Sequence, residues 1–527
     1  MKELIEWAEK RSTWIFILVG ILYFAGTGAI AWTKTMWLDE IATHIPATAQ
    51  SWGELWEYYA NGNEVHTPVA SAIMRLSLQV FGDNGWGVRL PYIVGYFLLV
   101  LGCYKFSGRR AGELWGLVAG SLVLVTSTFE YATEARPYAF LMGLGAMAAW
   151  AWQRLGEPGK RAGWLVLMTG SLALSISLHF FGVFLLIPLM GAELARWYER
   201  GRKDWAIAIA IALSPLSYLP FLPGVLKGKA IYAGNYWSRP QLSSIEESYR
   251  FLLTFAFFPL LAGLLAWALS RFLLPDSKQE NESPGKVPMP EWVLVGLWAT
   301  MPVFMVVASF ALGAYVARYA LPATFGVVVL ITWLFWQRSR NDRWLALVMA
   351  SVFVFWFSWK TPGTARRQWA ESGGYPNRSA DAFMHKKWRA SAHRSELPVV
   401  VTPAVFFINV FQYTTGPLHS RVRYISSRPY ATALDGTDTG DGWLIHTTKA
   451  GQLPVTDFDE FIKKNPRFLL LANTTVPTWQ VEKLRQLGAR LELVQREDAQ
   501  MLFEVSAPGS APRQEGANPV VPDGSHK

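Results

Sequence analysis

Long apolar runs fill the first two thirds of the chain, and ordinary mixed sequence follows Lys360. A helix that crosses a membrane needs about 20 mainly apolar residues, because each residue adds about 1.5 Å of length. The segments that approach this length are 13–32, 89–106, 113–129, 137–153, 164–180, 182–197, 205–223, 251–271, 292–312, 319–336 and 343–360. The pattern therefore predicts an α-helical polytopic membrane protein with about 11 transmembrane helices, followed by a smaller soluble domain.

The orientation is predicted from lysine and arginine, which concentrate in short cytoplasmic loops. If the N-terminus is cytoplasmic, every tight basic cluster falls on the cytoplasmic side. The clusters are Lys10–Arg11, Lys105 with Arg109 and Arg110, Arg154 with Lys160 and Arg161, Arg196 to Lys203, and Arg338 to Arg343. An odd number of spans then places the C-terminal domain outside. The expected location is the cell inner (cytoplasmic) membrane, with the functional face on the periplasmic, extracytoplasmic side.

The segment 68–81, PVASAIMRLSLQVF, is apolar but too short for a span. Arg75 and Gln79 lie four residues apart and so share one helical face, which suits a helix in the membrane interface. The predicted outer loop 33–88 is therefore large. Ser51 and Glu54 form a capping-box pattern, which predicts a short helix that ends near Gly62.

The sequence after the last span predicts an α/β domain. We expect strands at 398–402, 467–472, 489–495 and 500–505, and a helix at 478–487 that ends at Gly488. The polar, proline-rich stretch 275–290 is predicted to be a cytoplasmic linker, and the tail from Ala507 to be disordered. The expected domains are thus 1–361 (transmembrane), 362–506 (extracytoplasmic α/β) and 507–527 (tail).

Composition supports these boundaries and excludes some classes of site. Only 17% of the residues are charged, against about 25% in an average soluble domain. The net charge of +10 is explained by short basic loops that face anionic lipid, so no nucleic-acid partner is expected. The chain has one cysteine, Cys103, which excludes an internal disulfide and a multi-cysteine metal site.

Ionisable residues gather at the predicted outer ends of the spans. Each has a structural alternative: an acid can cap a helix, a histidine can be a packed core residue, and an arginine can extend toward lipid phosphate. The set is nevertheless unusual because all its members are predicted on one membrane face, and intramembrane charges commonly mark functional sites. Its members are Asp39, Glu40, His66, Glu134, Arg136, His179 and Arg318.

Such a set suits the transfer of a sugar from a polyprenyl phosphate. The phosphate is already a good leaving group, so no general acid is required. The acceptor hydroxyl needs a carboxylate that takes its proton, and the departing phosphate needs fixed cations. A single displacement would invert the anomeric configuration.

Several short motifs resemble the GT-C superfamily of polyprenyl-phosphate-sugar glycosyltransferases. The bacterial branch related to protein O-mannosyltransferases and lipid A aminoarabinose transferases (glycosyltransferase family 39-like) is most similar. The motifs are WLDE (37–40), HTPVASAIMRLSLQVFGD (66–83), GVRLPYIVG (87–95), GRRAG (108–112), EARPYAF (134–140), LHFFG (178–182) and ARYALPA (317–323).

The resemblance implies roles for these residues. Asp39 would be the general base, Glu40 would support it or bind the acceptor, and Glu134 would belong to the same catalytic set. His66, Arg136 and Arg318 would bind the donor phosphate. Tyr138, His179 and Tyr319 would bind substrate. The partners would be a polyprenyl-phosphate-linked sugar, such as an undecaprenyl phosphate sugar, the bilayer, and a glycan, lipid or protein acceptor.

The motifs also depart from the family pattern. Thr67-Pro68 stands where many relatives have Pro-Pro, and Ala70-Ser71 where they have bulky aromatics. These changes leave the sugar open, whether hexose or pentose. Asp39 and Glu40 could ligate a divalent metal, but this branch resembles metal-independent enzymes, so no metal or other cofactor is expected.

Two other functions fit a polytopic chain. A lipid or glycolipid transporter or flippase would place charged or broken segments near the bilayer midplane and would contain inverted repeats. The sequence contains no such repeat, and its ionisable residues lie at span ends. A non-catalytic scaffold with a soluble sensor domain would give no reason for the acidic, basic and histidine motifs.

Overall fold

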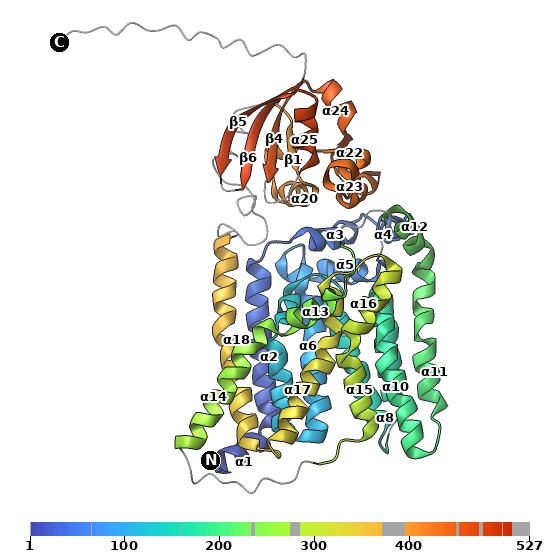
Figure 1. Ribbon diagram of the computed structural model, residues 1–527, viewed down its shortest axis with the longest axis vertical. Helices are drawn as coiled ribbons and strands as arrows, with labels where there is room; N and C mark the ends of the chain where they lie inside the picture. The colour runs from blue at the N-terminus through green and yellow to red at the C-terminus, as the bar shows by residue number, and fades with distance from the viewer. Residues whose placement is uncertain are drawn as a thin grey trace, which may run out of the picture. The chain divides into compact units, whose positions relative to one another are not determined.

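The computed structural model describes residues 2–64, 66–159, 161–232, 238–273, 285–371, 396–449, 453–473, 478–497 and 499–507 (Figure 1). The chain forms two compact units, Met1–Ala382 and Phe383–Lys527. Helix α18 (Arg343–Glu371) runs past residue 361, so the first unit extends beyond the domain boundary expected from the sequence. The tail 508–527 and residues 275–284 of the expected linker lie outside the described residues.

The first unit is helical. Most of its long helices lie side by side, roughly parallel or antiparallel to one another (Figure 1). In chain order the elements outside the loop 33–88 are α1 (Lys2–Lys10), α2 (Ser12–Thr33), α6 (Gly85–Ala111), α7 (Glu113–Leu124), η1 (Ser127–Thr133), α8 (Tyr138–Leu155), α9 (Arg161–Leu178), η2 (Phe180–Leu185), α10 (Leu186–Arg200), α11 (Trp205–Leu213), η3 (Ser214–Phe221), α12 (Leu222–Tyr232), α13 (Ser243–Leu253), η5 (Thr254–Ala256), α14 (Phe257–Leu273), α15 (Met289–Ala299), α16 (Met301–Leu312), η6 (Ala317–Ala323), α17 (Thr324–Arg338) and α18.

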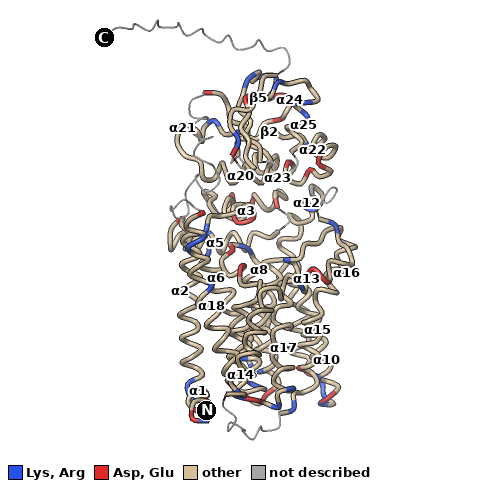
Figure 2. Tube along the Cα trace, turned by 60° about the vertical axis from the view of Figure 1, so that its left-hand side comes forward, with Lys and Arg blue, Asp and Glu red and all other residues tan. Residues whose placement is uncertain are grey.

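Every predicted span coincides with helical structure. Among the described residues, eight helices are long and apolar enough to cross a membrane, or up to ten if two bent pairs each count as one span. The bent pairs are α7 with η1 and α15 with α16. The remaining predicted span, 137–153, forms α8, whose small residues pack against α6 and α9. Charged residues gather at the two ends of the unit and are sparse between them, as a membrane-crossing bundle requires (Figure 2).

Glycines set the close approach of α8 to α6. A Cβ atom added at Gly143 would overlap the carbonyl oxygen of Gly95, and one at Gly102 would lie 2.6 Å from Cβ of Ala146. Small residues let helix backbones approach in membranes, where packing rather than the hydrophobic effect drives association. Gly102 and Gly143 therefore allow α6 and α8 to pack in close contact.

The loop 33–88 contains three short helices, α3 (Leu38–Ala47), α4 (Trp52–Ala60) and α5 (Val69–Phe81), at the end of the unit opposite α1 (Figure 1). The predicted helix start is confirmed, because the Glu54 amide donates to Ser51 Oγ. Helix α5 has 13 residues and is too short to cross a membrane. Arg75 explains its polar stripe: Nη1 donates to the carbonyls of Ala47 and Ala49 and so binds the C-terminal end of α3.

The second unit is an α/β domain. Its six-stranded sheet has the order β3-β2-β1-β4-β6-β5, in which β3, β2, β1 and β4 are parallel and β6 is antiparallel to both neighbours. The strands are β1 (Val399–Thr402), β2 (Val422–Ser426), β3 (Val455–Asp457), β4 (Arg467–Asn473), β5 (Arg490–Glu497) and β6 (Gln500–Ser506). The helices are α20 (Ala404–Tyr413), α21 (Gly416–His419), α22 (Arg428–Asp435), α23 (Thr439–Lys449), α24 (Phe458–Lys464) and α25 (Trp479–Gln486).

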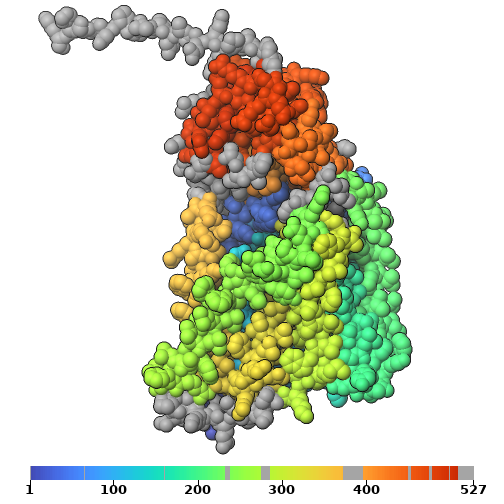
Figure 3. Space-filling model, in the orientation of Figure 1, coloured from blue at the N-terminus to red at the C-terminus, as the bar shows by residue number. Residues whose placement is uncertain are grey.

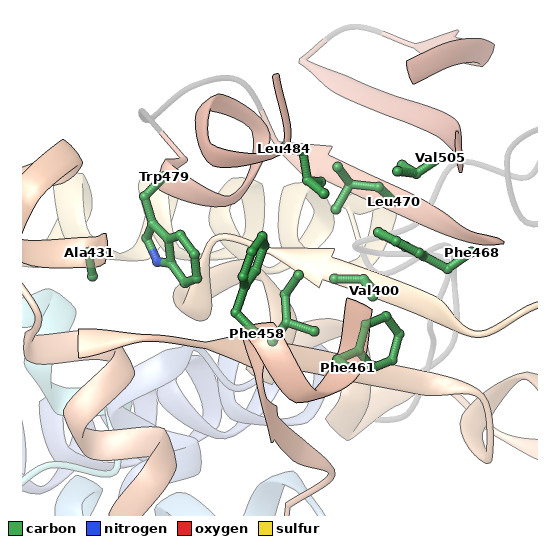
Figure 4. Packing of buried hydrophobic residues seen from close by; sticks show 10 residues of the cluster. Val400, Ala431, Phe458, Phe461, Phe468, Leu470, Trp479, Leu484 and Val505 are labelled. Atoms are coloured by element: carbon green, nitrogen blue, oxygen red, sulfur yellow. The ribbon is translucent and has the colours of Figure 1, made fainter. Parts of the chain in front are cut away.

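Aromatic residues dominate one face of the sheet. Phe458, Phe461, Phe468 and Trp479 pack around Val400 in the core between the sheet and helices α24 and α25 (Figure 4). The four predicted strands and the predicted helix are confirmed as β1, β4, β5, β6 and α25. Strands β2 and β3 and helices α20 to α24 were not predicted.

Candidate functional site

The WLDE motif forms the first turn of α3. Trp37 is the N-cap residue, and its amide donates to Glu40 Oε2 at 3.3 Å. The structural alternative for Asp39, an N-cap that binds its own helix, therefore does not hold. Successive helical residues are rotated by about 100°, so the adjacent carboxylates of Asp39 and Glu40 point in different directions.

Asp39 lies between two arginines. Its Oδ2 atom is 3.3 Å from Nη2 of Arg318 and 3.6 Å from Nη2 of Arg136. Arg136 also donates from Nη1 to the main-chain oxygen of Asp39 at 3.2 Å, and only 7% of the residue is exposed. The guanidinium of Arg318 lies 5.9 Å from the centre of the Trp37 ring. The three predicted residues thus form one cluster built from α3, the turn before α8, and η6.

Glu40 is fully buried in an ion pair with Arg89 of α6. Arg89 Nε and Nη2 donate to the two carboxylate oxygens at 2.8 and 2.9 Å. The other bonds of Arg89 go to the carbonyls of Ala31, Lys34 and Thr35, at the C-terminal end of α2. Because both side chains are 0% exposed, Glu40 lies out of reach of an acceptor, unlike one expectation from the sequence.

Glu40 also connects α3 to the EARPY segment, because the amide of Ala135 donates to its Oε1 at 2.9 Å. Ala135 is flanked by Glu134 and Arg136, so the buried pair fixes the backbone that carries both residues. Sequence reasoning missed Arg89. The feature that could have identified Arg89 is its position as the first residue of the apolar span 89–106, because a buried arginine usually pairs with a carboxylate.

Glu134 pairs with a lysine that sequence reasoning also missed. Lys34 Nζ lies 3.5 Å from Glu134 Oε1 and donates to the carbonyl of Thr133. Burial raises the pKa of Glu134, and the Lys34 charge opposes this shift; the carboxylates of Glu40 and Asp39 add to it. Glu134 therefore lies within electrostatic reach of Asp39.

Two histidines and several aromatic rings form the neighbouring part of the site. The ring centroids of His66 and His179 are 5.0 Å apart, and those of Tyr138 and Tyr319 lie 5.5 and 6.0 Å from His179. The Phe181 amide donates to Nδ1 of His179 at 3.2 Å, which places the ring proton of a neutral His179 on Nε2. Burial lowers the pKa of His66 well below its usual value, and the nearby His179 and arginines lower it further.

The site holds an unusual number of unsatisfied polar atoms. Buried polar groups are normally hydrogen-bonded, and exceptions often mark ligand sites. Within the described part of the chain, six buried atoms of this cluster have no hydrogen-bond partner: Asp39 Oδ2, His66 Nδ1, Glu134 Oε2, Arg136 Nε, His179 Nε2 and Arg318 Nε. The described residues contain no group of three His, Cys, Asp or Glu side chains that could hold a metal ion.

Helix α13 lies beside this cluster. It contacts η6, which carries Arg318, and η1, which precedes Glu134. Figure 3 shows the segment from α13 to α14 extending across one face of the helical unit. Every predicted site residue in the described chain thus lies at the same end of the unit, although Glu40 is enclosed in its ion pair with Arg89.

Comparisons with known proteins agree with the resemblance found in the sequence. Residues 65–222 match the family described as dolichyl-phosphate-mannose-protein mannosyltransferase. The chain is 24% identical over 360 residues to an undecaprenyl phosphate-alpha-4-amino-4-deoxy-L-arabinose arabinosyl transferase from Pseudomonas paraeruginosa, and 24% identical over 361 residues to that of Pseudomonas aeruginosa. The matches cover 64% of this chain and 62% of each relative, which is less than two thirds of the relatives' length.

Two solved structures share the fold. ArnT from Cupriavidus metallidurans matches with a TM-score of 0.55 and 13% identity, both in the apo state and bound to undecaprenyl phosphate. The matches cover 94% and 95% of this chain and 98% and 100% of the ArnT chain. These two structures confirm the fold class. The family match and the curated relatives support the resemblance to GT-C glycosyltransferases related to lipid A aminoarabinose transferases.

Proposed function

We propose that the protein is an inverting glycosyltransferase. It moves a sugar from a polyprenyl phosphate, at the outer face of the cytoplasmic membrane, to a hydroxyl of a lipid, glycan or protein. The observation that carries the proposal is the cluster of Asp39, Arg136 and Arg318, with its unsatisfied buried atoms. It combines a proton acceptor with fixed cations, as the reaction requires.

In the proposed reaction, an acceptor hydroxyl oxygen forms a bond to the anomeric carbon of the donor sugar. The bond between that carbon and the phosphate oxygen breaks, and its electron pair stays on the phosphate. The hydroxyl proton goes to the Asp39 carboxylate. Arg136 and Arg318 stabilise the negative charge that develops on the phosphate, because guanidinium groups bind phosphate oxygens in fixed geometry.

The histidine and tyrosine group would hold the rest of the donor. His179 presents Nε2–H as a neutral donor, and His66 lies next to it. The rings of Tyr138, Phe181 and Tyr319 offer apolar faces of the kind that pack against a sugar ring. Glu134, paired with Lys34, is close enough to influence Asp39 electrostatically, and we assign it a supporting role.

The test compares lipid and glycan extracts from cells that produce the wild-type protein or the Asp39→Asn variant. Comparing two versions of the same protein assigns any change in the extracts to this one carboxylate. We expect one glycan to lack a single sugar residue in the variant, and the polyprenyl-phosphate-linked sugar to accumulate. Identical extracts, with both proteins present at equal amounts, would contradict the proposal.

Three further features belong to the proposal. The active end and the C-terminal domain are assigned to the extracytoplasmic side, which a cysteine introduced at Ser51 tests with an impermeant thiol reagent. Labelling of intact cells is expected, and labelling only after membrane disruption would overturn the orientation.

Transfer is assigned no metal or other cofactor, so transferase activity should persist in EDTA.

A further inference from the structure

The two arginines of the site form an anion-binding pair that already holds an anion. Nη2 of Arg136 and Nη2 of Arg318 both approach the same oxygen, Asp39 Oδ2, at 3.6 and 3.3 Å. Arg136 is largely buried, and 17% of the Arg318 side chain is exposed. Two like charges in such a place repel each other and require a counter-ion. Asp39 is that counter-ion.

Arg136 and Arg318 bind the Asp39 carboxylate only through long ion pairs. At 3.3 and 3.6 Å these contacts are ion pairs rather than short charge-assisted hydrogen bonds, which measure about 2.7–2.9 Å. Within the described residues, Oδ2 of Asp39 and Nε of both arginines are buried without a hydrogen-bond partner. The guanidinium pair therefore keeps donors that one carboxylate oxygen does not satisfy and that a tetrahedral phosphate could satisfy.

We propose that the phosphate of the lipid-linked donor displaces Asp39 from Arg136 and Arg318, so that donor binding itself frees the carboxylate to accept the acceptor proton. This inference rests on the proposed function and deepens it. Asp39 then has two successive partners, the arginine pair before the donor binds and the acceptor hydroxyl afterwards. The donor must bind before the base is available.

The charges are consistent with this exchange. The arginine pair carries two positive charges and Asp39 supplies one negative charge. A donor phosphodiester supplies one more, so these three side chains and the phosphate together carry no net charge. After transfer the leaving polyprenyl phosphate is a monoester with up to two negative charges, and Asp39 holds the proton taken from the acceptor. When the polyprenyl phosphate leaves, Asp39 loses its proton to water and returns to the arginines.

The exchange predicts a change in phosphate affinity that a simple general base would not produce. If Asp39 only accepted a proton, its substitution would leave phosphate binding unchanged. If it competes for the arginines, removing its charge must strengthen phosphate binding. Asp39→Asn keeps the size of the side chain and should therefore bind undecaprenyl phosphate about tenfold more tightly than the wild-type protein, even though transfer is lost.

The measurement is the equilibrium binding of undecaprenyl phosphate to the full-length protein in lipid nanodiscs. Glu130→Gln is the matched control, because it removes one negative charge at an exposed residue of η1, outside the cluster. We expect tighter binding for Asp39→Asn and wild-type binding for Glu130→Gln. If Asp39→Asn does not purify as folded protein, Asp39→Ser removes the same charge and carries the same test.

The outcomes separate this inference from the proposed function. Equal or weaker binding by the folded Asp39 variant, with measurable binding by the wild type, overturns the exchange and leaves the transferase proposal intact. An equal gain in the affinity of Glu130→Gln for undecaprenyl phosphate also overturns the exchange, because the effect would then come from net charge alone. Failure of the wild-type protein to bind undecaprenyl phosphate overturns both proposals.

Discussion

The Oδ2 atom of Asp39 lies 3.3 Å from Nη2 of Arg318, although the two residues belong to helices at opposite ends of the helical unit's sequence. This contact brings a carboxylate and a cation to one place at the end of the unit opposite α1. Asparagine has nearly the same shape but cannot accept a proton. We therefore expect Asp39→Asn to lower the rate of transfer by about 10²–10⁴-fold, the range for loss of general base catalysis.

The rate is measured with purified protein, donor lipid and acceptor, and the fold is checked by thermal unfolding. Asp39→Glu is the control, since it keeps a carboxylate and should retain measurable turnover. Wild-type turnover in Asp39→Asn would remove the base from the mechanism.

Arg318 is expected to act mainly on donor binding. A hydrogen bond to a charged group contributes about 1.5–3 kcal/mol, so Arg318→Ala should weaken binding of undecaprenyl phosphate by roughly 10–100-fold. Arg250→Ala removes an exposed arginine of α13 that pairs with Glu246 in the same helix, and this variant should bind undecaprenyl phosphate normally. Unchanged affinity in Arg318→Ala would argue against contact with the phosphate.

The Glu40–Arg89 pair is expected to support the site through stability. Breaking a buried ion pair from one side costs about 3–5 kcal/mol, because the remaining charge is left without a partner. Arg89→Met should therefore lower the unfolding midpoint strongly in denaturant titrations of the purified protein. Adding Glu40→Gln to Arg89→Met should restore part of the lost stability. The glutamine side chain is neutral and can still accept a hydrogen bond from the Ala135 amide. An Arg89→Met protein as stable as the wild type would contradict this assignment.

The packing of α8 against α6 can be tested at a glycine. Gly143→Ala would place a methyl group against the backbone of Gly95, so we expect destabilisation of about 1–3 kcal/mol from overpacking. Gly170 in α9 has open space around its Cβ position. Gly170→Ala should be neutral or slightly stabilising, because alanine favours a helix by about 1 kcal/mol over glycine. Equal stability of the two variants would show that α8 and α6 are not in close contact.

In the C-terminal unit, Asp441 is expected to make stability depend on pH. Burial raises its pKa from 3.8 to about 6, although the Ser427 amide, the Trp479 indole and the Tyr424 hydroxyl donate to the carboxylate and oppose the shift. The protonated form is favoured in the folded state. Its stabilising contribution is thus complete below pH 3.8 and is lost as the pH rises through about 6.

The advantage of the wild type over Asp441→Asn should therefore shrink between about pH 4 and pH 7, by about 3 kcal/mol from the pKa difference. Hydrogen exchange of peptides from β2 and α25 in the full-length protein measures this local stability. Asp459→Asn, at an exposed position, should show no such change. A difference independent of pH would mean that Asp441 titrates as it does in the unfolded chain.

The sequence by itself determined where the chain is helical in the first unit. Uninterrupted apolar runs are a local property, and only helices satisfy the backbone in lipid, so the predicted spans coincide with helical segments. The sequence also determined two short helices of the loop 33–88, α4 and α5, because capping by Ser51 and the length of the apolar segment 68–81 are local features. Strands β2 and β3 were not predicted. Strand β3 has only three residues, and a strand of that length depends on its neighbour β2 for hydrogen bonds.

The tertiary structure alone decided how the charged residues pair. WLDE presents two adjacent acids, and nothing local states that Glu40 turns inward to Arg89 while Asp39 faces Arg136 and Arg318. That choice depends on the packing of α3 against α5 and on which residues of α6 and η6 the bundle brings beside it. Local periodicity places a residue on one face of its own helix, whereas its electrostatic partner is set by distant segments that pack there.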